Sequence, residues 1–206
     1  MALQRKDVVI KALDILQRDG VDGLTLRKLA AELNIQAPSL YTHVKSKRDL
    51  LDEMAEEILQ AKFLTMPEPY KDEEWRPWFK RAVHHVRTAL LAYRDGGLVA
   101  AGANPRRAKT YAKLGAHMLT ILCEQYGFDI VTAGRLITAA LVYTYGSVIK
   151  EQNTPSVEDI QETGPSIEEY FSAEMKQKLA AAAKEFKGAT DFFDQALDMM
   201  IRGVRR

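Results

Sequence analysis

Apolar residues in this chain recur at the spacing of an α-helix, and segments with the alternating pattern of a β-strand are nearly absent. Val9, Ala12, Leu13 and Leu16 follow an i, i+3, i+4, i+7 pattern, which places them on one face of a helix. The same spacing returns along the 206 residues, between breaks rich in proline and glycine. The sequence therefore predicts an all-α fold.

Composition narrows the class of protein. Hydrophobic residues make up 47% and charged residues 28%, which is ordinary for a soluble globular protein. The single cysteine, Cys123, excludes a disulfide within the chain and favours the cytosol. No signal peptide is visible, and no apolar run approaches the roughly 18 to 20 residues of a membrane span. We expect a cytoplasmic protein with no membrane partner.

The first fifty residues predict helices joined by tight turns. One helix spans about Arg5 to Asp19, and Thr25 is a good N-cap for a second helix that ends at Asn34. Pro38 suits the first turn of a third helix, because its missing N–H would be unsatisfied there in any case. This order is that of a helix-turn-helix, whose last short helix can enter the major groove of DNA.

The third helix has one apolar and one polar face. Leu40 and Val44 lie four residues apart and face inward, and the polar side chains around them are Gln36, Ser39, Tyr41, Thr42 and His43. Three bases suited to phosphates follow at Lys45, Lys47 and Arg48. Residues 1–50 hold nine basic and six acidic side chains, although the net charge of the chain is only +1. DNA binding is the favoured interpretation, and a generic three-helix packing unit is the alternative.

Segments that interrupt the helical pattern divide the rest of the chain. Ser46, with Asp49 three residues on, resembles a capping box for a fourth helix that continues towards Phe63. The segment "TMPEPYKDEEWRP" reads as a domain junction, "RDGG" and "GANP" as further breaks, and residues 152–166 as a polar loop. Further helices are expected near 75–94, 105–126, 129–151, 166–186 and 190–202. The expected domains are 1–48 (helix-turn-helix), 49–66 (connecting helix) and 67–206 (C-terminal).

These motifs carry a resemblance. "TLRKLAAELNIQAPSLYTHVKSKRDLLD" resembles the DNA-binding domain of the TetR family of bacterial transcription regulators, above all through its Leu-Tyr-x-His-x-x-x-Lys pattern. "ALLAYRDGGLVAAGANP" and "LVYTYGSVIKEQ" are similar to the ligand-binding domain of tetracycline repressors proper. The resemblance implies an all-α homodimer that joins through the helices near 129–151 and 190–202. It also implies binding to a palindromic operator in double-stranded DNA and release by a small-molecule effector.

The resemblance also implies the residues that contact DNA. The expected base readers are Arg27, Gln36, Ala37, Ser39 and Tyr41. The expected phosphate contacts are Thr25, Tyr41, His43 and Lys47, and Pro38 and Lys45 complete the set. Ala37 departs from the family, which often has a polar base reader there. A methyl group can only touch a thymine methyl or make room, so we expect an operator other than the tetracycline operator.

The ligand site implied by the resemblance has changed chemistry. Ala100 replaces a histidine that holds the magnesium–drug complex, Ala103 a hydroxyl-bearing residue, and Lys150 a carboxylate. Magnesium prefers oxygen ligands, so we expect no metal, no cofactor besides the effector, and a more apolar cavity with His117 as polar anchor. The expected ligand-binding residues are Ala82, Val86, Ala100, Ala103, Asn104, Pro105, Leu114, His117 and Ile137.

Other interpretations stay open. A regulator of this family with a filled cavity would need no small molecule. A helical enzyme with a DNA-binding appendage has no support in paired carboxylates, a Cys–His arrangement or a glycine-rich phosphate loop, so we expect no catalysis. His84 and His85 are adjacent, which does not suit a metal pair on a helix, and each is expected to be a core or surface residue. Tyr143 and Tyr145 are expected to be structural.

Overall fold

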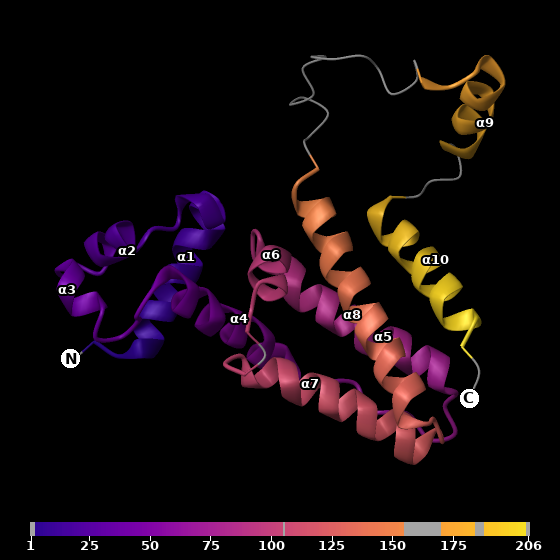
Figure 1. The fold of residues 1–206 in the computed structure, drawn as a ribbon, viewed down its shortest axis with the longest axis horizontal. Helices are drawn as coiled ribbons and strands as arrows, with labels where there is room; N and C mark the ends of the chain where they lie inside the picture. Colours follow the sequence, from indigo (N-terminus) through magenta and orange to yellow (C-terminus); the bar gives the residue numbers. More distant parts are fainter. Residues whose placement is uncertain (1–2, 105, 155–169, 184–187, 205–206) are drawn as a thin grey trace. The chain divides into compact units, whose positions relative to one another are not determined.

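The computed structural model describes residues 3–104, 106–154, 170–183 and 188–204, which are helical and contain no β-strand (Figure 1). The prediction of an all-α fold is confirmed. The helices are α1 (Arg5–Gly23), α2 (Leu26–Glu32), α3 (Ala37–Leu40), α4 (Lys47–Phe63), α5 (Trp75–Leu91), α6 (Gly96–Ala101), α7 (Lys109–Thr120), the π-helical turn η1 (Ile121–Gln125), α8 (Ile130–Gln152), α9 (Ala173–Ala183) and α10 (Ala189–Arg202). They divide into two compact units, one ending at Gln152 and the other running from Asn153 to Val204.

The turns between the first helices follow the sequence signals. Helical geometry breaks at Gly20, with φ 74° and ψ 177°, and resumes for one short turn, so that α1 extends to Gly23. The Thr25 hydroxyl caps α2 by accepting a hydrogen bond from the Lys28 N–H at 3.1 Å. Asn34 adopts the left-handed conformation, with φ 54°, just after α2. The predicted cap and stop of this helix are confirmed.

The start of α4 differs slightly from the expected capping box. The Ser46 hydroxyl accepts from the Asp49 N–H at 3.1 Å, as predicted. The Asp49 carboxylate, however, accepts from the Lys45 N–H at 2.7 Å, one residue before the expected position. Helix α4 therefore holds the chain that leaves α3 as well as its own first turn. Its end at Phe63 agrees with the sequence.

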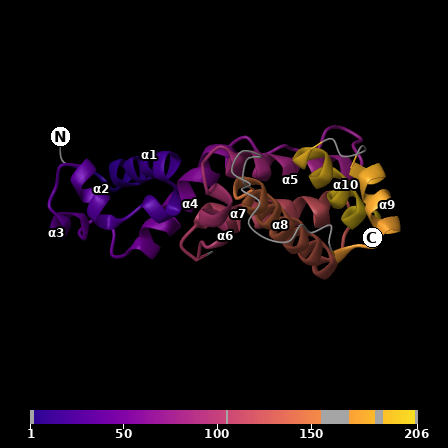
Figure 2. The same cartoon turned by 90° about the horizontal axis from the view of Figure 1, so that it is seen from above.

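Helix α4 connects two parts of the first unit. Helices α1, α2 and α3 gather at one end, and α4 runs from them to α5, α6, α7 and α8 (Figure 2). It packs against α1, α5, α6 and α7. Because α4 begins directly after α3 and its turn, a change in its position moves the third helix with it.

Aromatic side chains build the core around the start of α5. Trp75 meets Phe128 edge-on with ring centroids 5.0 Å apart, and Trp78 lies 5.7 Å from Tyr126. The Trp78 Nε1–H donates to the Pro67 carbonyl at 2.8 Å, which ties the segment before α5 to the helix. These contacts fix α5 as one wall of the interior, with buried residues along its length.

Helix α6 is the main departure from the expected helices, because its segment reads as a break. Asp95 precedes it in the left-handed conformation, with φ 55°. Val99 and Ala100 bury its inner face. A Cβ on Gly97 would lie 2.9 Å from a Val148 side-chain carbon, so a glycine is needed where α6 crosses α8. The break signals therefore mark the ends of a short buried helix.

Later elements follow the prediction with shifted bounds. Helix α7 begins at Lys109 and leaves α-helical geometry at η1, whereas a single helix over 105–126 was expected. Helix α8 matches the expected 129–151 closely. Much of the expected polar loop and the start of the expected 166–186 helix lie outside the described residues.

The second unit is described by α9 and α10. On α10, Phe193, Leu197 and Ile201 form a buried stripe, while Phe192 and Met199 are exposed. Across the residues that the structure describes, no helix combines the length and apolar character needed to span a membrane.

Candidate nucleic-acid interface and effector pocket

An exposed surface surrounds the third helix. We define the reading surface as Gln36, Ala37, Pro38, Ser39 and Tyr41, of which the first four are exposed and Tyr41 is 53% exposed. Leu40 and Val44 are buried beneath it, as the sequence predicts. Packing thus holds α3 from one side and leaves the reading surface open to solvent.

The remaining residues expected to contact DNA lie around this surface. Arg27 is exposed on α2, Thr25 and Lys45 are exposed, and His43 is partly buried. Thr25 uses a lone pair of its hydroxyl as the α2 cap, which leaves its O–H as a donor. These residues belong to α2, to α3 and to the segments next to them, and α2 packs against α3.

Lys47 occupies a less open position. Its ammonium donates to the Val21 carbonyl at 2.8 Å. The N–H of the same residue, Val21, donates to the Asp95 carboxylate at 2.8 Å. One residue at the end of α1, Val21, thus connects the first residue of α4 with the turn before α6.

Arg94 adds to the connection between α1 and the turn before α6. Its backbone N–H donates to the Gln17 side chain at 2.8 Å, and its guanidinium donates to the Arg18 carbonyl at 2.9 Å. The end of α1 is therefore held by side chains from two later parts of the chain.

Ion pairs join α1 to α2. Asp19 accepts from the Lys28 ammonium at 2.9 Å, and Arg18 pairs with Glu32 and with Asp19. The Lys28 hydrogen bond holds the pKa of the Asp19 carboxyl below its ordinary value, and the Glu32 hydrogen bond raises the pKa of the Arg18 guanidinium. These pairs are solvent-exposed, so they orient α2 with a small effect on stability.

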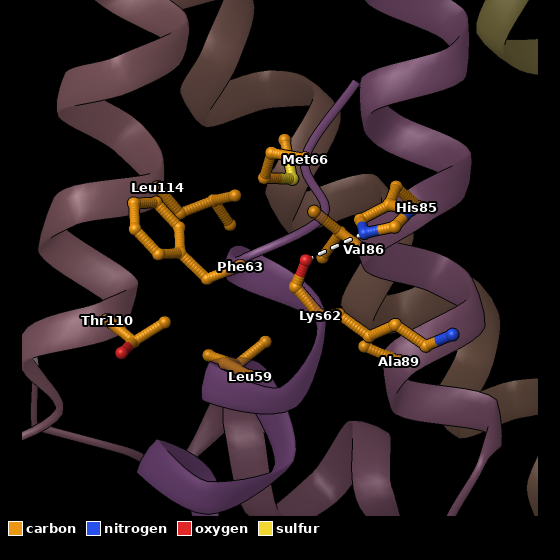
Figure 3. Close-up of a pocket in the computed structure, with 9 residues that line it drawn as sticks. All are labelled: Leu59, Lys62, Phe63, Met66, His85, Val86, Ala89, Thr110 and Leu114. Carbon is orange, nitrogen blue, oxygen red and sulfur yellow. Dashed lines mark hydrogen bonds between the residues drawn. The ribbon is translucent and has the colours of Figure 1, made fainter. Parts of the chain in front are cut away.

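A small apolar pocket lies where the end of α4 meets α5 and α7 (Figure 3). It has room for little more than one water molecule. Its walls contain Leu59, Lys62, Phe63, Met66, His85, Val86, Ala89, Thr110 and Leu114. Val86 and Leu114 were expected at the ligand site, and the structure places both in this wall.

The polar side chains on the α5 and α7 walls are already hydrogen-bonded. His85 Nε2 lies 2.8 Å from the Lys62 carbonyl oxygen, the contact drawn in Figure 3. Thr110 donates to the Glu56 carboxylate twice, from its backbone N–H at 2.8 Å and from its hydroxyl at 2.7 Å. Both acceptors, Lys62 and Glu56, belong to α4.

The other expected ligand residues lie elsewhere. Ala82, Ala100 and Ile137 are buried on α5, α6 and α8, and none of them lines this pocket. Ala103 is partly buried, and the Asn104 N–H donates to the Asp52 carboxylate at 2.9 Å. Pro105 lies outside the described residues.

His117, the expected polar anchor, also lies outside the pocket wall. Its Nε2 is 3.2 Å from a Glu68 carboxylate oxygen, without hydrogen-bond geometry, and its ring meets Phe63 edge-on at 6.4 Å. The contact with Phe63 places His117 one side chain away from the pocket.

Sequence reasoning missed His85, Thr110, Phe63 and Met66. Phe63 and Met66 are apolar residues at a helix end and in a domain junction, which is a weak signal for a pocket. No local pattern marks His85 or Thr110, because their partners are 23 and 54 residues away.

The side chains at the expected metal positions do not fit magnesium. Ala100 and Ala103 offer methyl groups and Lys150 offers an ammonium, whereas the ion prefers oxygen ligands. Within the part of the chain that the structure describes, no group of three or more His, Cys, Asp and Glu side chains is arranged to hold a metal ion.

The fold and the reading surface together define a helix-turn-helix protein with a helical C-terminal domain, the class of DNA-binding regulators. Family models agree over most of the chain. Residues 10–54 match "Bacterial regulatory proteins, tetR family", and residues 67–206 match "Tetracyclin repressor-like, C-terminal domain". The chain belongs to the TetR family of bacterial transcriptional regulators.

Individual relatives cover nearly the whole chain. It is 37% identical to the class A tetracycline repressor protein from transposon 1721 of Escherichia coli, over 99% of this chain and 91% of that protein. The crystal structure of class A TetR with 5a,6-anhydrotetracycline and magnesium is similar with a TM-score of 0.69 and 31% identity, over 98% and 97% of the two chains. BioQ with its double-stranded DNA operator matches with a TM-score of 0.63 and 25% identity, over 73% and 87%.

Proposed function

We propose that this protein is a homodimeric repressor that binds a palindromic operator and leaves it when a small-molecule effector binds without magnesium. The observation that carries the proposal is the reading surface, exposed above the buried Leu40 and Val44 in a chain of the TetR family. The proposed divisions are 1–48 for DNA binding, 49–66 for connection and 67–206 for effector binding and dimerisation. The protein acts in the cytoplasm and catalyses no reaction.

On the DNA side, base contacts come from the reading surface and from Arg27, and phosphate contacts from Thr25, His43, Lys45 and Lys47. Two copies related by a two-fold axis place their third helices roughly 34–36 Å apart, the distance between successive major grooves. Ala37 reads no hydrogen-bonding group and selects a thymine methyl or free space. The operator therefore differs from that of a relative with a polar side chain there.

On the effector side, the proposal rests on the family and on the pocket between α4, α5 and α7. A related repressor binds 5a,6-anhydrotetracycline with magnesium. In this chain the corresponding positions lack oxygen ligands, and the pocket wall is mostly apolar. The effector is therefore held by apolar contact and by hydrogen bonds to side chains. Helix α4 carries its effect to α3.

Exposed apolar side chains support dimerisation through α8 and α10. On α8, Ile130, Val131 and Val142 are 66%, 54% and 64% exposed, and a Cβ on Gly134 would meet nothing within 4 Å. On α10, Met199 is 75% exposed. Ile130, Val131 and Val142 line one shallow face of α8. A contiguous apolar face of this kind marks an interaction site, and the partner proposed here is a second copy of the chain.

The test is a binding experiment with an operator selected in vitro from random duplexes. Tyr41→Ala should weaken binding at least tenfold, because Tyr41 is exposed on the reading surface and its loss leaves the core intact. Tyr70→Ala, at another exposed tyrosine, is the matched control and should bind as the original chain does. Selection of no inverted repeat, or equal affinity of both variants, would contradict the proposal.

A further inference from the structure

The pocket wall and α4 share hydrogen bonds at two points. The first is His85 on α5. A carbonyl oxygen can only accept, so His85 Nε2 carries the hydrogen and donates it to the Lys62 carbonyl in the last turn of α4. This bond holds the C-terminal end of α4 against α5.

The second point is Thr110 on α7, which is only 3% exposed. Its N–H and O–H donate to the two oxygens of Glu56, at 2.8 and 2.7 Å. Hydrogen bonds to an ionised carboxylate are among the stronger ones in proteins. Thr110 therefore holds the middle of α4 against α7, and its side chain faces the pocket at the same time (Figure 3).

The Lys62 carbonyl and the Glu56 carboxylate would each keep a hydrogen-bonding partner if His85 and Thr110 donated elsewhere. The Lys62 carbonyl also accepts from the Thr65 hydroxyl at 3.1 Å and from the Thr65 N–H at 3.0 Å. Glu56 is partly exposed, so water can solvate its carboxylate. Exchange of the donors to a new acceptor therefore avoids the penalty of a buried, unpaired polar group.

The small size of the pocket also indicates that ligand binding would move α4. The cavity has room for little more than one water molecule, far below the roughly 300–1,000 Å³ of ordinary ligand sites. A molecule that fills it must push its walls apart, and three of these walls are α4, α5 and α7. Binding is then tighter to a state in which α4 has moved, which is the condition for a ligand to shift a conformational equilibrium.

We propose that His85 and Thr110 are the effector-sensing residues. The effector is a compact, largely apolar molecule with acceptor oxygens that take the His85 N–H at one wall and the Thr110 O–H at the opposite wall away from α4 (Figure 3). With both bonds lost, α4 moves and carries the third helix with it. This inference rests on the proposed function and specifies its ligand class and the residues that sense the ligand.

Variants test the two bonds without any ligand. Thr110→Val removes the hydroxyl at nearly constant volume, and His85→Phe removes the ring N–H. Each should weaken operator binding about fivefold to tenfold, within the usual range of coupling between sites, and Thr110→Ser should restore the original affinity. The matched controls are Thr88→Val, whose hydroxyl bonds within α5, and His84→Phe at the neighbouring histidine. Both controls should bind within twofold of the original chain.

Hydrogen–deuterium exchange gives a second readout that needs no DNA. The amides in the last two turns of α4 should exchange faster in Thr110→Val and in His85→Phe, while those of α8 keep their rates. Where one variant fails to fold, the other carries the test. Unchanged operator affinity together with unchanged exchange in α4 overturns the role of both residues.

Acetophenone and ethylbenzene test the ligand class, because they have similar shape and only the ketone has an acceptor oxygen. The chain has four histidines, so the His85 ring signal can be assigned in a histidine-labelled NMR spectrum by comparison with His85→Phe. Acetophenone should shift this signal and ethylbenzene should not. An equal response to both compounds, or to neither, overturns the ligand class. Failure of the original chain to select any operator instead contradicts the proposed function and leaves the NMR result standing.

Discussion

The reading surface and the pocket prepare for binding in opposite ways. Gln36 and Ser39 on the reading surface are exposed and need no rearrangement to meet a ligand. In the pocket, Val86, Thr110 and Leu114 are at most 3% exposed, and the polar groups are already bonded to α4. The first site can bind as it stands, whereas the second can bind only by changing the structure around it. This difference suits an effector that shifts a conformational equilibrium of the protein.

Between these sites, α4 carries a row of carboxylates that fasten it to the α6–α7 connection. Asp49 and Asp52 are buried and pair with Arg107, and Asp52 also accepts the Asn104 N–H. Glu56, one turn further along α4, accepts hydrogen bonds from Thr110. Residues in the segment 104–110 therefore hold the first part of α4 through hydrogen bonds and ion pairs, and His85 holds its C-terminal end.

The largest expected effect is a loss of stability that leaves DNA affinity unchanged. Leu114→Ala should lower the free energy of unfolding by about 3 kcal/mol, because it removes a buried side chain from the pocket wall. Operator affinity of the folded dimer should stay within twofold. Denaturant unfolding and DNA titration measure the two quantities. The half-exposed Leu98→Ala is the control, with a much smaller loss of stability. A larger change in DNA affinity than in stability would remove the distinction between the two sites.

The next effect concerns the joint between α1 and the turn before α6. Gly20 has φ 74° and ψ 177°, a region open almost only to glycine, and an added Cβ would lie 2.9 Å from Asp95 Oδ2. Gly20→Ala should therefore destabilise the protein by about 2 kcal/mol. Gly115→Ala is the matched control: a Cβ there meets nothing within 4 Å, so this variant should be neutral or slightly stabilising in a thermal melt. Equal melting temperatures for the two variants would contradict the role given to Gly20.

A smaller effect decides what Lys47 does. If its ammonium leaves the Val21 carbonyl for a phosphate when DNA binds, Lys47→Met should weaken binding to all sequences about tenfold and lower the salt slope by about one. Lys71→Met, at an exposed lysine away from the reading surface, should change neither quantity. A loss of affinity with an unchanged salt slope would show that Lys47 only supports the end of α1.

The smallest expected effect concerns how the melting temperature depends on pH. The Lys28 hydrogen bond holds the pKa of Asp19 below its ordinary value of 3.8, so the ionised carboxylate stabilises the fold above pH 3.8. This contribution is lost as pH falls through the lower pKa of the folded state. Asp19→Asn should thus melt below the original chain at pH 7 and approach it as the pH drops below 3.8. Melting curves at low salt test this, because salt screens exposed pairs. A difference that stays constant with pH would contradict it.

The reading surface was predictable because its signals are local. The apolar spacing of Leu40 and Val44, the cap at Thr25 and the left-handed Asn34 each act within a few residues, and all three agree with the structure. The resemblance then assigned DNA contacts to exposed positions. Those contacts remain predictions, and the binding experiments above address them.

The pocket was harder to predict because distant residues build it. His85 meets Lys62 across 23 residues and Thr110 meets Glu56 across 54, and no helical periodicity encodes either pair. Positions carried over from the family placed Val86 and Leu114 in the wall but not His117 or Ala100. Helix α6 was missed for a different reason, because the glycines that flank and begin it read as a break.

The way α1 ends has a practical consequence for protein engineering. The Val21 N–H and the Arg18 carbonyl bond to Asp95 and Arg94, about seventy-five residues further along the chain. The N-terminal helices are therefore not a self-contained cassette. A chimaera that grafts residues 1–48 onto another effector domain must bring an acceptor and a donor at the positions of Asp95 and Arg94, or the last turn of α1 will fray at the graft.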